Sequence, residues 1–181
     1  VALATEGRQC DVGLVESTVT GQNLLLHPFS VPCVCLMNKK HELAQKKHID
    51  LIDLDNLPLI GITGTHKLDL ELNQLAQNAG INLQRRANAY FFAIARQLVS
   101  KNIGVAIIDI MNGVVDLDAD LTWRPFTPEL SYEMTAIQPK LKTIPIQTET
   151  FIECMEKELV EIRATYESGL VNGPKTSADH I

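Results

Sequence analysis

The chain has 181 residues, which is long enough to bury a hydrophobic core and corresponds to one domain or two small subdomains. Its formal net charge of −6 disfavours binding of nucleic acid or of an acidic membrane surface by these residues. No apolar run approaches the ~20 residues of a membrane span, and no signal peptide opens the sequence, so we expect a cytoplasmic protein that does not enter a membrane.

The four cysteines are interpreted as thiols rather than disulfides. Cys33 and Cys35 lie on one face of a predicted strand, where a disulfide between such close neighbours would require distortion. The histidines show no metal-ligand spacing with one another or with the cysteines, and the aspartates at 116, 118 and 120 lack the glycine and glutamate of a calcium loop. We expect no metal, no cofactor and buried free thiols in a reducing cytoplasm.

The first third of the chain predicts mainly strands. Residues 11–16 form a short strand, residues 24–26 begin another, and residues 31–37 continue extended past Pro32. Pro32 favours an edge strand or a crossing segment rather than a central strand. Residues 49–56 form a short helix or turn, and residues 59–62 form a buried strand.

The middle of the chain alternates helices with strands. Apolar residues at helical spacing predict an amphipathic helix over 67–79 that Gly80 ends, followed by a strand over 81–86. Asn88 is expected to cap a second helix over 89–100, which is apolar almost all round and so should be deeply packed. A continuous apolar strand over 103–108 follows, as in a covered parallel sheet.

The last third predicts two strands, over 121–126 and 132–138, and a closing helix. The helix is expected to start at Thr148 or Thr150, because Thr150 and Glu153 form a capping-box pattern. Its buried face is predicted as Phe151, Met155, Leu159, Ile162 and Tyr166, with a polar tail beyond Ser168. The alternation predicts the α/β class with parallel strands.

The strongest candidate for a binding site is the turn made by Thr63, Gly64 and Thr65. It follows a buried strand and precedes a helix, so its hydroxyls and the free backbone N–H groups of the helix start suit a carboxylate. An ordinary helix cap is the alternative.

Other candidates lie at the ends of further strands. Asn88 and Tyr90 open the next predicted helix, and ligands bind outside the carboxyl ends of parallel strands; a cap and a core tyrosine are the alternatives. Asp109 ends an apolar strand and would meet a ligand amine, or would be a hydrogen-bonded hinge carboxylate. Glu16 and Ser17 would face a cleft or lie in a solvated loop.

We predict no catalytic residue. The sequence contains no Gly-x-Ser-x-Gly elbow, no phosphate-binding loop with Lys and Ser or Thr, and no His-Glu-x-x-His. A nucleophile–base pair cannot be assembled from it, so an enzyme is the weaker hypothesis.

Five stretches in order resemble the effector-binding domain of LysR-type transcriptional regulators. They are residues 7–14, the turn Lys40-His41-Glu42-Leu43-Ala44 with Glu42 where proline is usual, residues 51–60, residues 102–108 with Asn102 replacing a glycine, and Phe151 in the closing helix. Together they span about 160 residues.

The resemblance implies two Rossmann-like α/β subdomains arranged as in type II periplasmic solute-binding proteins. Subdomain I would combine residues 1–31 with 127–168, subdomain II would span 32–126, and 169–181 would be a flexible tail. Residues 1–6 read as the end of a helix, so we expect that the first strand and helix of the effector domain, and a DNA-binding winged helix-turn-helix, lie upstream of this sequence.

The resemblance also implies a small-molecule effector bound between the subdomains, a homodimer or homotetramer, and contact with DNA only through the upstream reader. Glu16 falls where some aromatic-acid sensors carry a basic residue. With Asp109 it suits an amine-bearing ligand, such as an amino acid or an opine-like molecule, whose carboxylate the turn from Thr63 to Thr65 would hold. The alternatives are a periplasmic-type solute-binding protein and a small α/β enzyme.

Overall fold

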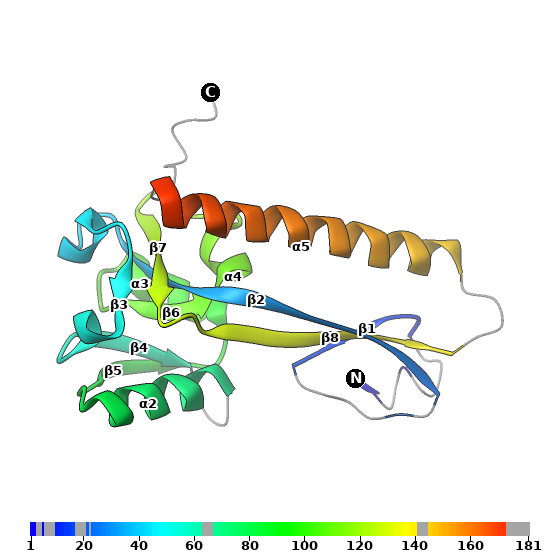
Figure 1. Cartoon of the computed structure of the whole chain (residues 1–181), viewed down its shortest axis with the longest axis horizontal. Helices are drawn as coiled ribbons and strands as arrows, with labels where there is room; N and C mark the ends of the chain where they lie inside the picture. The colour runs from blue at the N-terminus through cyan, green and yellow to red at the C-terminus, as the bar shows by residue number, and fades with distance from the viewer. Residues whose placement is uncertain are drawn as a thin grey trace. The chain divides into compact units, whose positions relative to one another are not determined.

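The computed structural model describes residues 1–2, 5, 10–16, 21, 23–62, 67–140 and 145–172. Its elements, in chain order, are β1 (Gly13–Val15), β2 (Leu24–Asn38), the 3-10 turn η1 (Glu42–Gln45), β3 (Ile49–Asp50), the 3-10 turn η2 (Leu51–Leu54), β4 (Pro58–Ile62), α2 (Lys67–Ala79), β5 (Gln84–Ala89), α3 (Phe92–Ser100), β6 (Ala106–Asp109), α4 (Ile110–Val114), β7 (Leu121–Thr127), β8 (Ser131–Pro139) and α5 (Ile146–Asn172). Figure 1 shows these elements along the chain.

The chain divides into two compact units. Unit 1 comprises Val1–Val31 and Glu133–Glu161, and unit 2 comprises Pro32–Tyr132 and Ile162–Ile181. The chain therefore leaves unit 1 within β2 and returns to it within β8. That these units are subdomains which close around a ligand stays a prediction.

Unit 1 is a small antiparallel sheet. β1 pairs with β8 with Gly13 opposite Ile137, and β8 also neighbours β2. Leu24 and Ile137 are buried, and Gly13 packs closely, since a Cβ there would lie 2.5 Å from the side chain of Val1 and 2.8 Å from that of Thr5. The predicted strand at 11–16 is confirmed as the shorter β1, whereas half of the predicted helix at 1–6 lies outside the described residues.

Unit 2 is built around the second half of β2. Val34 pairs with Ile108 of β6 on one side and with Pro125 of β7 on the other, both antiparallel. Residues Cys33 to Met37 are fully buried, so this part of β2 is a central strand and the edge alternative suggested by Pro32 is wrong. The crossing alternative fits, because the boundary between the units falls at Pro32.

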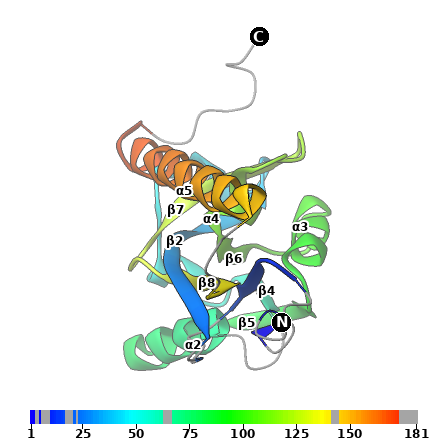
Figure 2. The same ribbon diagram turned by 90° about the vertical axis from the view of Figure 1, so that its right-hand side faces the viewer.

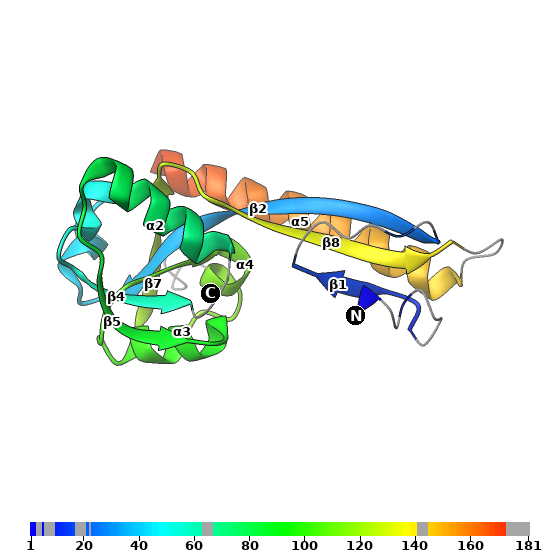
Figure 3. The same cartoon turned by 90° about the horizontal axis from the view of Figure 1, so that it is seen from below.

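Parallel pairing is confined to part of unit 2. β4 pairs with β5, and β3 pairs with β7, in parallel. Helices α2 and α3 cover opposite faces of the β4–β5 pair, as Figures 2 and 3 both show. The α/β class is confirmed, while the sheet is mixed rather than wholly parallel.

The predicted helix over 67–79 and the strand over 59–62 are confirmed as α2 and β4. Gly80, with φ of 69°, ends α2 as expected from its freedom to adopt the left-handed conformation. The strand predicted at 103–108 is confirmed as the shorter β6.

Three expectations about helices are wrong. Asn88 does not cap a helix but lies in β5, and α3 begins at Phe92. Only Ala95 and Val99 of α3 are buried, so this helix is not deeply packed. The final helix begins at Ile146, and Phe151 is 45% exposed while Ile152 is buried in its place. The rest of the predicted face holds: Tyr166 is buried, and Met155, Leu159 and Ile162 are half-buried.

Candidate effector site at the carboxyl edge of β4, β5 and β6

The carboxyl ends of three strands meet at one edge of unit 2. Ile62, the last residue of β4, lies opposite Ala89, the last residue of β5. A parallel bridge joins Leu59 to Val105, so β6 runs in the same direction as β4 and ends at the same level. We call this set of strand ends the carboxyl edge. It is the place where parallel α/β sheets bind ligands.

The predicted turn of Thr63, Gly64 and Thr65 lies outside the described residues, as does Ser17. The described elements on either side of residues 63–66 are β4, which ends at Ile62 on the carboxyl edge, and α2, which begins at Lys67. Glu16 is described; it is exposed and belongs to unit 1.

Asp109 ends β6 at the carboxyl edge and is fully buried. Its Oδ1 accepts the backbone N–H of Asn112 at 3.0 Å and its Oδ2 accepts the Asn112 side-chain amide at 2.8 Å, so it caps α4. Burial raises the pKa of this carboxyl above its usual value, and the hydrogen bonds from Asn112 oppose that shift. The geometry matches the alternative of a hydrogen-bonded hinge carboxylate, and a role toward ligand stays a prediction.

Tyr90 follows β5 at the carboxyl edge and is 78% exposed, so the alternative of a core tyrosine is wrong. Asn88 lies one residue before the end of β5, paired with Gly61 of β4, and it is exposed. Both side chains are accessible, although whether either contacts a ligand stays a prediction.

A polar network that the sequence did not indicate fixes α2 onto β4 and β5. Arg85 donates to Asp69 Oδ1 at 2.7 Å and to Asn73 Oδ1 at 2.8 Å, and the Ile62 backbone N–H donates to Asp69 at 3.4 Å. The guanidinium lies over Gly61, where a Cβ would be 1.9 Å from Arg85 Nη1. Asp69, in the first turn of α2, therefore connects the last residue of β4 with Arg85 of β5. A glycine within a strand was the available signal.

The turn that resembles the family motif is held by a second arginine. Arg124 donates to the backbone oxygens of Lys46 at 2.6 Å and of Ala44, which fixes η1 against β7. His41 Nδ1 accepts the Leu43 backbone N–H at 3.2 Å and so caps η1. Burial lowers the pKa of His41, and the nearby Glu42 opposes that shift. This region is structural rather than a site.

The cysteines that the structure describes are thiols, as predicted. Burial raises the pKa of both Cys33 and Cys35 far above the usual thiol value, which makes them inert in acid–base chemistry at neutral pH. Within the described part of the chain, no three His, Cys, Asp or Glu side chains are grouped so as to hold a metal ion. Among those same residues, no helix has both the length and the apolar character needed to span a bilayer.

A mixed α/β fold of this kind is that of type II periplasmic-binding-like ligand domains. Residues 3–160 match the model of the LysR substrate binding domain, so the chain belongs to this family, the effector-binding domains of LysR-type regulators.

A curated relative is the regulatory protein NocR of Agrobacterium tumefaciens (strain T37), which is 24% identical over 110 residues. That match covers 61% of this chain and 37% of NocR, so the chain spans little more than a third of this relative. The family is one of transcription regulators.

Two solved structures share the fold. One is the regulatory domain of CcmR from Synechocystis PCC6803 in complex with 2-PG, with a TM-score of 0.65 and 17% identity over 87% of this chain and 77% of that one. The other is HinK, a LysR family transcriptional regulator from Pseudomonas aeruginosa, with a TM-score of 0.69 and 12% identity over 87% of this chain and 55% of that one.

Proposed function

We propose that this chain is the inducer-sensing domain of a bacterial LysR-type transcription regulator, and that its effector is a small carboxylate bearing an amine, such as an amino acid or an opine-like molecule. Membership of the family supports the sensing role. In this proposal the effector binds between the two units, the protein is a cytoplasmic homodimer or homotetramer, and DNA is contacted only by a winged helix-turn-helix upstream in the same polypeptide.

One observation carries the choice of site: β4, β5 and β6 end at the same carboxyl edge. Thr63, Gly64 and Thr65 follow β4 there and would offer two hydroxyls and backbone N–H groups to the carboxylate of the effector. Asp109 follows β6, and with Glu16 it would attract the amine. Asn88, Tyr90 and Ser17 complete the proposed contacts.

The burial of Asp109 suggests how binding would produce a signal. Asp109 is fully buried, and its two oxygens accept hydrogen bonds from Asn112 at the start of α4, so an effector amine would reach it only if the start of α4 moved. Binding would thereby be coupled to the position of α4 and to the relative arrangement of the units. The effector shifts that arrangement only by its difference in affinity for the two states.

Calorimetric titration of the chain with amino acids, opines, aromatic acids and dicarboxylates tests the proposal. An amine-bearing carboxylate should bind, and at 100 times its Kd it should stabilise the chain by about 2.7 kcal/mol and raise Tm by about 5–10 °C. Thr63→Val should weaken binding about tenfold, because a hydrogen bond to a charged group is worth about 1.5–3 kcal/mol.

Thr150→Val is the matched control, since its hydroxyl donates within α5 to the Ile146 oxygen at 2.9 Å. It should leave the affinity unchanged. Tight binding of a plain dicarboxylate alone, or equal effects of the two substitutions, would contradict the proposal.

A further inference from the structure

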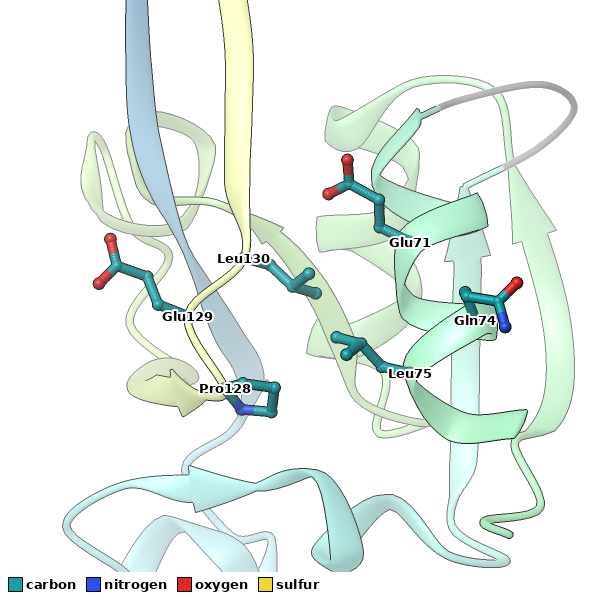
Figure 4. Close-up of a pocket in the computed structure, with 6 residues that line it drawn as sticks. All are labelled: Glu71, Gln74, Leu75, Pro128, Glu129 and Leu130. Carbon is teal, nitrogen blue, oxygen red and sulfur yellow. The ribbon is translucent and has the colours of Figure 1, made fainter. Parts of the chain in front are cut away.

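Unit 2 contains a pocket on the flank of α2, opposite the segment that links β7 to β8. Its volume is about 290 Å³, and the described residues that line it are Glu71, Gln74, Leu75, Pro128, Glu129 and Leu130. In Figure 4, Leu75 and Leu130 point toward each other from α2 and from this segment, with Pro128 below them. None of Glu16, Asn88, Tyr90 and Asp109 is among these lining residues.

The pocket explains an irregularity in the packing of α2. Leu68, Leu72 and Ala76 are buried, whereas Leu75, on the same apolar stripe, is only half-buried. Leu130, which faces it, is 5% exposed. The pocket is open to solvent on one side, and its volume of about 290 Å³ exceeds the ~150 Å³ that encloses a benzene, so a phenyl group can lie in it with its substituent toward solvent.

The charges around the pocket are negative. Glu71 and Glu129 line it, and Figure 4 shows the Glu71 carboxylate turned toward the β7–β8 segment, whereas that of Glu129 points away from α2. Burial is the main cause that raises the pKa of Cys33, and the nearby carboxylates of Asp109, Glu71 and Glu129 raise it further. The backbone N–H of Cys33 donates to Leu130 at 2.8 Å, so this potential acts directly beside the pocket.

Among the described residues, Glu71 forms an ion pair with Lys67, with 3.6 Å between Lys67 Nζ and Glu71 Oε1. The pair is exposed and joins residues four apart on a helix, which makes it worth only about 0.3–0.5 kcal/mol. A carboxylate has about four acceptor positions, so Glu71 can accept a further donor from the pocket side.

We propose that this pocket is a second small-molecule site, which takes an apolar group bearing an ammonium ion. The apolar group would fill the space between Leu75 and Leu130, and the ammonium would lie against Glu71. The site lies between α2, which follows residues 63–66, and the β7–β8 segment, after which the chain re-enters unit 1 at Glu133. A ligand there contacts both, and would bias the effector response.

The test uses the full 181-residue chain and three probes of similar size: 2-phenylethylamine, 3-phenylpropanoate and 3-phenylpropan-1-ol. Binding is followed by calorimetry and by the methyl NMR signals of Leu75 and Leu130. The amine should bind at least five times more tightly than the carboxylate and should shift both leucines. Binding of the amine at Asp109 or Glu16 in the proposed effector site is distinguished by the methyl signals of Leu75 and Leu130 and by the Glu71 variants, because these three residues line the pocket and Asp109 and Glu16 do not.

Substitutions at Glu71 sharpen the test. Glu71→Gln should weaken amine binding about threefold to fivefold, as expected for one partly exposed ion pair, and Glu71→Lys should reverse the preference in favour of 3-phenylpropanoate. Glu156→Gln, at an exposed position of α5, is the matched control and should change nothing. Circular dichroism checks that each variant folds.

Four results would overturn the proposal. In the affinities, they are equal binding of the three probes, an unchanged preference in Glu71→Lys, and the absence of binding at 10 mM amine. In the NMR spectra, it is binding that leaves the Leu75 and Leu130 methyl signals unmoved.

Discussion

Gly104 should be one of the least replaceable residues in unit 2. It lies where the strand leading into β6 passes β4, and a Cβ at Gly104 would be 2.4 Å from the backbone oxygen of Pro58. Ordinary contact begins at 3.4 Å, so Gly104→Ala must separate the two strands by about 1 Å. Backbone on both sides leaves no flexible side chain to move instead.

That separation would break two hydrogen bonds. The Val105 N–H donates to the Pro58 oxygen at 3.0 Å, and the Ile60 N–H donates to the Val105 oxygen at 2.8 Å. An opening of about 1 Å takes both past hydrogen-bond range. Each buried group left unpaired costs about 1–3 kcal/mol, so we expect a loss of about 2–4 kcal/mol in the free energy of unfolding.

Urea denaturation followed by fluorescence measures this loss in the relevant unit, because the chain's single tryptophan, Trp123, is buried in β7. Gly80→Ala is the control: Gly80 has φ of 69°, but a Cβ added there would meet no described atom within 4 Å, so the variant should lose only about 1 kcal/mol through strain. A Gly104→Ala variant as stable as Gly80→Ala would refute the argument from close approach.

Two further predictions concern the polar contacts of unit 2. Gly61→Ala should displace the Arg85 guanidinium from Asp69 and lower the free energy of unfolding by about 1–3 kcal/mol. In an Arg85→Ala background the same substitution should cost much less, which a double-mutant cycle measures. Equal costs in both backgrounds would show that the network does not act through Gly61. Burial lowers the pKa of His41 below 6.5, so the unfolded chain takes up the proton first and stability should fall as pH decreases through that value. His41→Asn, which can still accept from the Leu43 N–H, should lose less stability between pH 7.5 and 5.5; parallel losses in denaturation midpoint would contradict this.

The elements predicted best are those whose sequence pattern is compatible with only one type of secondary structure. The apolar spacing from Leu68 to Ala76 fits only a helix, and Gly80 allows the left-handed turn that ends it. The predicted β4, at Leu59 to Ile62, is an apolar run too short for a helix and is bounded by Pro58 and Thr63.

The errors arise where tertiary contacts outweigh local pattern. The sequence from Ala89 to Phe92 reads as the start of an apolar helix, yet pairing with β4 extends β5 to Ala89 and delays α3. The buried face of α5 includes Tyr166 as predicted but Ile152 rather than Phe151, because residues three and four positions before Met155 both lie on its side of the helix and spacing alone does not choose between them.

The candidate site was predictable only in outline. Strand ends mark the carboxyl edge in the sequence, but the Arg85–Asp69 network joins residues 16 apart on two elements, and no local pattern pairs them. Likewise, the sequence left open whether Asp109 would be buried, because its burial depends on the start of α4 covering it.

The central claim is that an amine-bearing carboxylate binds at the carboxyl edge of β4, β5 and β6. A crystal structure of the chain with the tightest ligand from the calorimetric panel tests it most directly. The account predicts density for the ligand with its carboxylate on the turn of Thr63 to Thr65 and its amine toward Asp109. Density for the ligand that contacts neither the turn nor Asp109 would contradict it.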